Sequence, residues 1–446
     1  PTPVFARLLR VTEELKRGPA LLLKGCRPEP PAVAVYYSAA NWHASTLSSG
    51  VGNHVNNLGF AYEKWFQANL LRSYDNPDRE AAAVSAEDAA FYHLWEGSPR
   101  AGHYAASEKN FALLLFDLGL DFQLVDGREV AAGGLEKYRV LILPFVEALS
   151  PAEGEAIVRF VEDGGLVVAD YNCGLRDGHG KFYNRALLDN LFGIRRPENY
   201  RLALAANSVT VDGTAYQQSL QARFSSVFSG QNLQVSGARA LGCGDDGAPA
   251  FIAGEHGRGR TLYLNCDLYS YHGLRRNGRE TEVRELLAGI LAGMGRLDLS
   301  GRPRDVDGNP LSHLRLFRFS DGDLSCTAVL KDHLVHDGRT VSARLPLGRG
   351  IHVYEARLGR YCGQAAETSF DLAPGGCQIF AALPYKLQEV KLAAPKRVKR
   401  GETLTLQIRL GGPVSGKFVR HVLRIRVCGP NGQERRCLGG VIEVRD

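Results

Sequence analysis

The stretch "VLILPFVEALSPAEGEAIVRFVEDGGLVVADYNCGL", residues 140–175, decides the fold because it has the pattern of a strand, a helix and a second strand. The apolar run 140–143 is short and partly β-branched, as in a strand buried on both faces. A serine–proline pair at 150–151, followed by a glutamate, is typical of a capped helix start, and a glycine pair ends that helix. A second buried run follows at 166–169. We therefore expect a parallel βαβ unit, with Cys173 at the carboxyl edge of its sheet.

Similar patterns lie on both sides of this unit. Strands are predicted at 33–38, 121–125 and 257–266, and helices at 107–120, 186–194 and 281–294. Between about 200 and 260, short alternating strands indicate an antiparallel excursion inserted into the domain. After residue 300 helical periodicity disappears, and alternating segments broken by turn signals predict a β-sandwich. A break at 384–388 precedes a few strands of another, incomplete sandwich.

The segment 3–17 reads as one amphipathic helix. Its apolar residues, expected to face inward, are Phe5, Leu8, Leu9, Val11 and Leu15. A lone helix of this length is marginal in water, so it needs a surface to pack on. The proline-rich segment that follows reads as a linker.

Composition excludes several classes of protein. The chain has 446 residues, 44% hydrophobic and 23% charged, which is ordinary for globular domains. Its net charge is +6, but the basic residues are interleaved with acidic ones, so we expect no nucleic-acid partner. No apolar run is long enough to predict a membrane-spanning helix. The sequence starts at Pro1 without a methionine, from which we expect a fragment of a longer protein.

The nine cysteines show neither a CxxC pair nor the His/Cys spacing of a metal site, so we expect no metal and no cofactor. Their odd number leaves at least one thiol unpaired. This usage is typical of a reducing, cytoplasmic compartment. An exported protein with one or two disulfides is the alternative.

Several segments together resemble the region that follows the catalytic barrel in glycoside hydrolase family 42 β-galactosidases. They are "EELKRGPALLLKG", "VAVYYSAANWH", "DFQLVDG", "GRGRTLYLN" and the stretch that begins "YRVLILPFVEALSP". That region is the β-galactosidase trimerisation domain, which has a class I glutamine-amidotransferase-like fold. "HVYEARLGRYCGQ" and "LAPGGCQIFAALP" are similar to the small β-sandwich that follows it.

The resemblance implies a scaffold. The segment 3–17 would be the last helix of a (β/α)8 barrel, and the catalytic glutamates of the family would precede Pro1. The stretch 39–105 is longer than we expect of the family. The resulting fold class is a multidomain α/β plus all-β protein, with a flavodoxin- or amidotransferase-like parallel sheet covered by helices on both faces and β-sandwich modules after it. The expected boundaries are 1–28 for the terminal helix and linker, 29–299 for the amidotransferase-like domain, 300–385 for the sandwich and 386–446 for a partial immunoglobulin-like domain.

Cys173 is the first catalytic candidate, with His272 as its possible base. An amidotransferase nucleophile needs a strained turn flanked by small residues, and no glycine stands two positions before or after Cys173. His272 is the plausible base by chain order, but it lacks the carboxylate partner two residues away that a catalytic His-x-Glu pair supplies. We therefore expect no catalytic residue here.

Two further groups are candidate binding residues. Asp177 and His179 lie in a glycine-rich loop after the second strand, where solvated turn residues are the common alternative to a ligand pocket. The aromatic group Trp42, Trp65, Tyr92, Trp95 and Tyr104 would stack on sugars, or would fill a core or subunit interface.

No pair of carboxylates is nominated for glycoside hydrolysis. Glu147, Glu153, Glu155, Glu162 and Asp163 lie on or beside one predicted helix and read as its solvated face.

The sequence as a whole predicts a non-catalytic assembly portion of a glycoside-hydrolase-42-like, β-galactosidase-like protein. We expect it to associate with itself, with a trimer as one form, or with a catalytic barrel, and carbohydrate is a possible ligand. One alternative is a free-standing amidase or amidotransferase that uses Cys173 and His272. Another is a carbohydrate-binding module carried by the sandwich.

Overall fold

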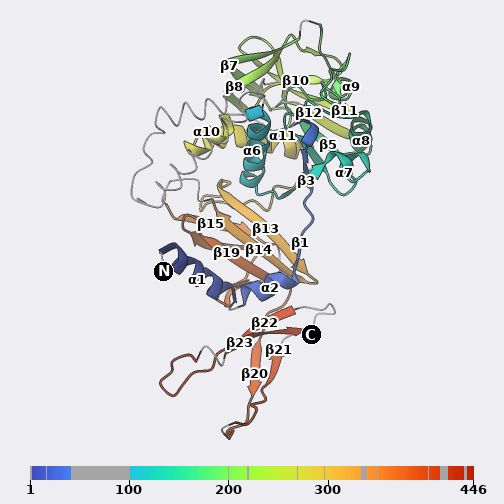
Figure 1. Cartoon of the computed structure of the whole chain (residues 1–446). Helices are drawn as coiled ribbons and strands as arrows, with labels where there is room; N and C mark the ends of the chain where they lie inside the picture. The colour runs from blue at the N-terminus through green and yellow to red at the C-terminus, as the bar shows by residue number, and fades with distance from the viewer. Residues whose placement is uncertain are drawn as a thin grey trace. The chain divides into compact units, whose positions relative to one another are not determined.

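The chain forms a sheet-dominated fold with two compact units (Figure 1). One unit is Pro31–Leu299, and the other combines Pro1–Pro30 with most of the chain from Ser300 to Asp446. The computed structural model describes residues 3–16, 18–41, 101–198, 200–217, 220–268, 270–295, 297–332, 339–348, 350–399, 401–411, 420–435 and 439–445. The second unit is therefore built from two chain segments that flank the first in sequence.

The first unit contains a nine-stranded sheet in the order β3-β2-β4-β5-β12-β11-β10-β7-β8. The first five of these strands are parallel to one another. They are β2 (Val33–Tyr37), β3 (Phe122–Asp126), β4 (Val140–Leu143), β5 (Leu166–Ala169) and β12 (Gly259–Tyr263). The structure confirms the predicted parallel strand–helix–strand unit, because β4 and β5 pair in parallel register from Val140 opposite Leu166.

The antiparallel strands predicted between 200 and 260 are present, and they are inserted in sequence between the adjacent parallel strands β5 and β12. They are β7 (Arg201–Asp212), β8 (Gln221–Gln231), β10 (Arg239–Gly244) and β11 (Pro249–His256). β11 pairs antiparallel with β12, and β10, β7 and β8 follow it. Because β12 offers a free ladder of backbone groups on that side, these strands extend the same sheet. The short strands β6 (Ile194–Arg195) and β9 (Gln234–Val235) pair separately.

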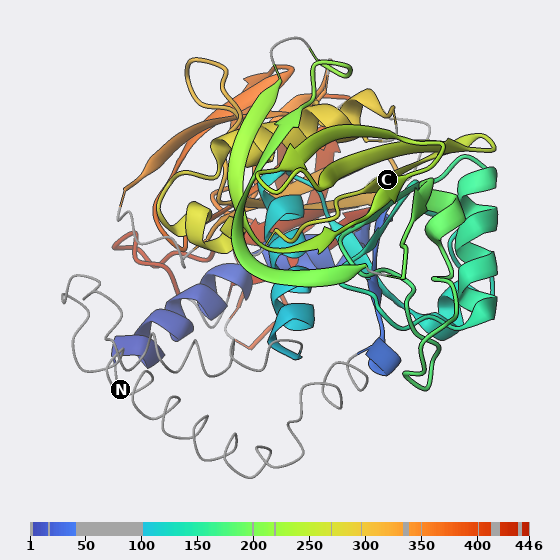
Figure 2. The same cartoon turned by 90° about the horizontal axis from the view of Figure 1, so that it is seen from above.

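Helices cover both faces of the parallel strands, and alternate residues of each strand point to opposite faces. Val33 and Val35 of β2 join one apolar cluster, and Ala34 and Tyr36 join the other. The first cluster takes residues of α6 (Ala101–Asp117), α10 (Ser270–Arg276) and α11 (Thr281–Gly293). The second takes residues of α7 (Gly127–Ala131), α8 (Pro151–Glu162) and α9 (Asp189–Phe192). Figure 2 shows α6, in cyan, and α8, in green-blue, on either side of the strands.

The start of α8 has the cap that the sequence predicts. The Ser150 hydroxyl accepts from the Glu153 backbone N–H at 3.4 Å, and the Ser150 N–H donates to the Glu153 carboxylate at 2.5 Å. The helix predicted at 186–194 is only the single turn α9, because Gly193 takes the left-handed conformation, with φ 61°, and ends it.

The second unit contains a six-stranded sheet in the order β1-β13-β14-β19-β16-β17. These strands are β1 (Arg27–Pro28), β13 (Leu314–Asp321), β14 (Leu324–Lys331), β16 (His352–Glu355), β17 (Arg360–Gln364) and β19 (Cys377–Leu383). The paired strands β15 (Val341–Pro346) and β18 (Glu367–Leu372) share an apolar cluster with one face of this sheet. The helix α2 (Pro19–Gly25) packs on the opposite face through Leu22 and Leu23. Two separate strand pairs complete the unit: β20 (Glu389–Ala393) with β21 (Gln407–Gly411), and β22 (Arg420–Ile425) with β23 (Gly440–Arg445).

The predicted N-terminal helix is present as α1 (Pro3–Lys16), but three of the five apolar residues expected to face inward are exposed, and the side chains of Phe5 and Leu8 lie outside the described part of the chain. Leu9, Val11 and Leu15 are 46%, 52% and 38% exposed. A polar contact, the ion pair of Glu14 with Arg357, anchors α1 within its unit. Leu9, Val11 and Leu15 thus lie on the surface of this chain.

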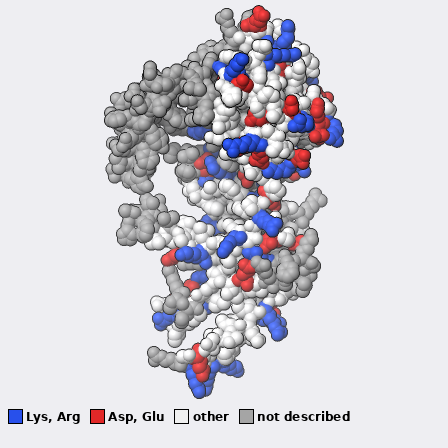
Figure 3. Space-filling model, turned by 45° about the vertical axis from the view of Figure 1, so that its right-hand side comes forward, with Lys and Arg blue, Asp and Glu red and all other residues white. Residues whose placement is uncertain are grey.

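Positive and negative side chains are interspersed on the face of the molecule in Figure 3. None of the helices in the described part of the chain is long and apolar enough to cross a membrane. Within the same residues, no group of three or more His, Cys, Asp or Glu side chains is placed to hold a metal ion.

Candidate functional site

Buried polar side chains gather where the parallel strands of the first unit end. We call this group the edge network: Asn41, Glu147, Asp170, Asn172, Arg176, Asp189, Arg196, Tyr200 and Tyr263. Asn41, Glu147 and Asn172 are only 0%, 3% and 4% exposed. Open α/β sheets bind ligands at this edge, outside the carboxyl ends of the strands. The network therefore occupies the position at which a site is expected.

The backbone at this edge is strained at two of the strand ends. Phe145, after β4, has φ 45°, and Asn172, after β5, has φ 61°. Asparagine tolerates the left-handed conformation, but an aromatic residue rarely adopts it. Phe145 is held by hydrogen bonds on both sides: its N–H donates to Asp170 Oδ1 at 2.6 Å, and its carbonyl accepts from Asn41 Nδ2 at 2.6 Å. These buried contacts hold the conformation in place.

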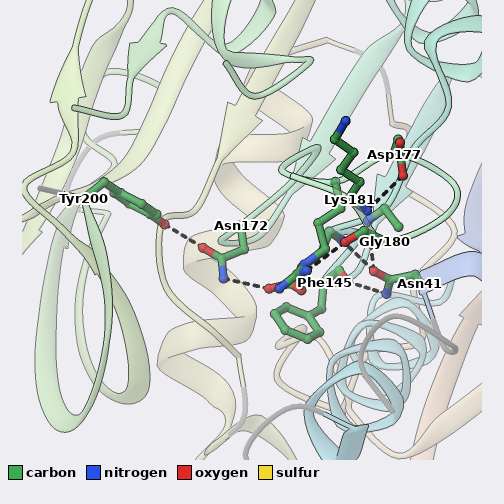
Figure 4. A network of polar contacts seen from close by, with 10 residues as sticks. Asn41, Phe145, Asn172, Asp177, Gly180, Lys181 and Tyr200 are labelled. Carbon is green, nitrogen blue, oxygen red and sulfur yellow. Dashed lines mark hydrogen bonds and ion pairs between the residues drawn. The ribbon is translucent and has the colours of Figure 1, made fainter. Parts of the chain in front are cut away.

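Asn172 is the centre of the network (Figure 4). Its side-chain amide donates to Glu147 Oε1 at 2.9 Å, and its side-chain oxygen accepts from the Tyr200 hydroxyl at 2.7 Å. Its backbone N–H donates to the Tyr263 hydroxyl at 3.0 Å. One residue therefore joins the loops after β4 and β5 to β12 and to the segment before β7.

Glu147 ties two more segments to this centre. Its backbone N–H donates to Asn41 Oδ1 at 2.7 Å, and its carboxylate lies 3.5 Å from Arg176 Nε. Arg176 also donates to the Gly180 carbonyl at 2.8 Å, and its guanidinium lies 3.7 Å from the centre of the Phe182 ring. The expectation that Glu147 belongs to a solvated helix face is wrong, because this carboxylate is buried and paired.

On the far side of Asn172, Arg196 pairs with the carboxylate of Asp189 and donates to the Tyr263 hydroxyl at 2.8 Å. Its guanidinium also lies 5.5 Å from the centres of the Tyr200 and Tyr263 rings, within cation–π range. Burial raises the pKa of Asp189, and the neighbouring Arg196 opposes that shift. This buried charge pair fixes the positions of Arg196 and Asp189, since the charge of either residue would be left uncompensated if the two separated.

Asp170, also a member of the network, is fully buried. It accepts hydrogen bonds from the Ser107 hydroxyl and from the Phe145 N–H. Burial raises its pKa well above the ordinary aspartate value, and the two hydrogen bonds oppose that shift. A carboxyl group in this position joins α6 to the ends of β4 and β5.

The side chains of the edge network are bonded chiefly to one another and lie away from solvent. A general acid or base has to reach a substrate proton within hydrogen-bond distance, and a nucleophile has to be exposed beside a base. Among the residues that the structure describes, the network offers neither. Its arrangement suits the fixing of loops rather than the conversion of a substrate.

The structure places Cys173 in the core, where it is 1% exposed and belongs to the apolar cluster on the α8 side of the sheet. Burial raises the pKa of its thiol. The left-handed positions of the turn belong to its neighbours, Asn172 with φ 61° and Gly174 with φ 72°, and not to Cys173. Cys173 is therefore not presented as an activated thiolate.

His272 is not brought to Cys173. It lies on α10, whose Tyr271 packs in the cluster on the opposite face of the sheet. Its backbone N–H donates to the Asn110 side chain at 2.9 Å. The sheet thus lies between the two candidate residues.

Asp177 closes its own turn, because its carboxylate accepts from the backbone N–H of His179 at 2.9 Å. It also accepts from the backbone N–H of Lys181 at 3.0 Å (Figure 4). The hydrogen bond from Lys181 is the main cause of its lowered pKa. His179 is exposed. The candidates Trp42, Trp65 and Trp95 lie outside the described residues.

These observations define the class of protein. It has a mixed α/β domain in which the domain's own polar side chains fill the carboxyl edge of the parallel strands, and this domain is joined to antiparallel β modules. Residues 85–290 match the family model of the β-galactosidase trimerisation domain. The resemblance seen in the sequence is confirmed.

Two known β-galactosidases are similar to parts of this chain. The β-galactosidase BbgII of Bifidobacterium bifidum is 25% identical over 177 residues, which cover 38% of this chain and 24% of that protein. The crystal structure of a β-galactosidase from Bacillus circulans sp. alkalophilus shares the fold, with a TM-score of 0.54 and 16% identity, over 85% of this chain and 45% of that one. The chain spans less than half the length of either protein.

Proposed function

We propose that this chain is the non-catalytic assembly portion of a β-galactosidase-like glycoside hydrolase. The observation that carries the proposal is the match of residues 85–290 to a trimerisation domain. The edge network supports it, since buried and mutually bonded side chains occupy the part of the sheet where related folds bind ligands.

In finer detail, the proposed fold of residues 29–299 is that of a class I amidotransferase without its chemistry. The parallel strand order β3-β2-β4-β5-β12 supports this, because it corresponds to the 2-1-3-4-5 order of flavodoxin-like sheets. The burial of Cys173 and its separation from His272 argue against the amidase alternative. We propose a β-sandwich for 300–385 and a partial immunoglobulin-like module for 386–446. A carbohydrate ligand stays a prediction.

The proposed assembly is a homotrimer because the matched family model is that of a trimerisation domain. We expect closed symmetry because most soluble homo-oligomers have it. The exposed stripe of α1, formed by Leu9, Val11 and Leu15, is a candidate contact surface, either for another copy or for a catalytic barrel. A second candidate contact surface is the edge strand β3, on which Leu124 is 48% exposed.

Sedimentation velocity of the purified 446-residue chain at micromolar concentrations tests the proposal. We expect a trimer. If α1 forms the contact, the double substitution Leu9→Ser/Leu15→Ser should weaken the trimer. If β3 forms the contact, Leu124→Ser should weaken it instead. The exposed Leu392→Ser, which changes an apolar side chain of β20 that belongs to neither group of residues, is the control. A monomer at tens of micromolar would refute self-association.

The same preparation should neither hydrolyse aryl β-galactosides nor release ammonia from glutamine. Turnover that a substitution within residues 1–446 abolishes would contradict the non-catalytic role.

A further inference from the structure

Two thiols from distant parts of the chain meet beneath α2. Cys26 follows the last residue of α2 and is 8% exposed, and Cys326 lies within β14 and is 0% exposed. Both belong to the apolar cluster between α2 and the sheet, together with Leu324, Ala381 and Leu383. The described cysteines are all free thiols.

The strand register fixes both positions. Cys326 pairs with Phe319 of β13 on one side and with Ala381 of β19 on the other, so it lies in the interior of the sheet. The residue after Cys26 begins β1, which pairs with β13 at Ser320. The Cys26 thiol also donates to the Leu22 carbonyl at 3.3 Å. The end of α2 and strand β14 thus bring the two thiols into one apolar cluster, in which they hydrogen-bond to each other.

The surroundings make the two thiols unequal. Hydrogen bonding by the Cys326 thiol lowers the pKa of Cys26, and the positive charge of Arg420 acts in the same direction. The same bond, together with burial, raises the pKa of Cys326. A thiolate is the nucleophile in disulfide exchange, so Cys26, which is also the more exposed of the two, is the group that attacks first.

We propose that Cys26 and Cys326 form a reversible disulfide by exchange with a small-molecule disulfide, and so fasten the N-terminal segment to the sheet. In the first step the Cys26 thiolate attacks the disulfide RSSR, which breaks its S–S bond, forms Cys26–S–SR and releases RS⁻. In the second, Cys326 loses its proton and attacks Cys26 Sγ, which releases a second RS⁻. The protein thiols lose two electrons and two protons, and RSSR becomes two RSH.

The bond has a clear mechanical consequence. The second unit is built from two segments, and the whole first unit lies between them in sequence. A disulfide from residue 26 to residue 326 joins these segments covalently and encloses the first unit in a loop. Cross-linking residues so far apart restricts the unfolded chain strongly.

The experiment compares the full chain after reduction with dithiothreitol and after equilibration with oxidised glutathione. Mass mapping of non-reduced peptides should find one cross-linked pair, Cys26–Cys326, in the oxidised sample. The second unit should melt roughly 5 °C higher when oxidised. Cys26→Ser and Cys326→Ser should abolish both effects, whereas Cys362→Ser, at an exposed cysteine of the same unit, should keep both.

Two outcomes would overturn the proposal. One is a persistent glutathione adduct on Cys26 with Cys326 still reduced, which would mean that the second attack cannot take place. The other is cross-linking of Cys26 or Cys326 to different cysteines. The mapping of the wild-type chain decides between these results even if a serine variant fails to fold.

Discussion

The side-chain amide of Asn172 donates to Glu147 Oε1 at 2.9 Å, and this bond ties the loop after β5 to the loop after β4. Both residues are almost fully buried. In an enzyme of this fold the same edge would be open to a substrate. Here the loops are bonded to each other, so the edge acts as a rigid part of the scaffold.

Asn172 should be the most sensitive position of the network. Asn172→Ala removes the hydrogen bonds to the Glu147 carboxylate and from the Tyr200 hydroxyl and puts an alanine at φ 61°, so we expect a loss of about 2–4 kcal/mol. Asn172→Gly loses the same hydrogen bonds but tolerates the backbone, and should cost about 1 kcal/mol less. Chemical denaturation measures the loss of stability in both variants, and hydrogen exchange in the peptides of β4 and β5 shows where the structure is loosened. Equal, small losses in the two variants would show that the network is not stabilising.

Asp170 should make stability depend on pH in an unusual direction. Because burial raises its pKa in the folded state, the stability that Asp170 contributes is complete below the unfolded value of about 3.9 and is lost as the pH rises toward the folded value. Asp170→Asn removes this titration and keeps an acceptor for the Phe145 N–H. The stability of the Asp170→Asn variant relative to wild type should therefore rise with pH above about 4, by at most about 1.4 kcal/mol per pH unit.

Asp177→Asn is the control of opposite sign. Hydrogen bonds lower the pKa of Asp177, so its contribution is present above the unfolded pKa and is lost as the pH falls through the folded value. Denaturant titrations from pH 3 to pH 8, roughly the range where carboxylates titrate, give both profiles. A flat difference between Asp170→Asn and wild type would contradict the raised pKa.

Local patterns in the sequence predict the strands, the helices and their order well. The βαβ unit at 140–169 could be found because its cap, its periodicity and its glycine stop act within a few residues. The site could not be found in this way. Glu147 resembles any surface glutamate in the sequence, and only the folded chain brings Asn41, Asn172 and Tyr200 to it. The one local signal was an asparagine shortly after a strand end, a residue type that tolerates left-handed backbone.

One error and one omission have the same origin. The apolar stripe of α1 was expected to be buried, because amphipathic periodicity shows which face is apolar but not whether a partner covers it. The proximity of Cys26 and Cys326 has no local signal, since it depends on how two remote segments pair through β13.

Cys173 should react slowly with alkylating reagents. Its thiol is buried and its pKa is raised, so iodoacetamide at neutral pH should modify it at least roughly tenfold more slowly than the exposed Cys243, Cys362 and Cys428. Buried Cys266, whose pKa burial also raises, is the matched reference. Mass spectrometry of peptides over time measures each rate. If Cys173 were alkylated before the exposed cysteines, the case for an inert residue would fail.

A side chain at Gly25 should displace the Arg420 guanidinium, which lies against this glycine. A Cβ built on Gly25 would be 1.4 Å from Arg420 Nη1, although Gly25 does not have a left-handed φ. Arg420 would have to move, and would lose its contacts with Asp321 at 3.2 Å and Glu443 at 3.3 Å. We expect Gly25→Ala to destabilise the second unit by about 1–3 kcal/mol, with faster hydrogen exchange in α2 and β22.

A double-mutant cycle separates this clash from other effects of the added methyl group. In an Arg420→Ala background, Gly25→Ala should cost less than about 0.5 kcal/mol, because the obstructing side chain is gone. Gly440→Ala, at a glycine of the same unit with open space around it, should be close to neutral in both backgrounds. If Gly25→Ala destabilises the chain equally with and without Arg420, the contact between α2 and β22 does not explain the glycine, and the coupling energy measured in the cycle will be zero.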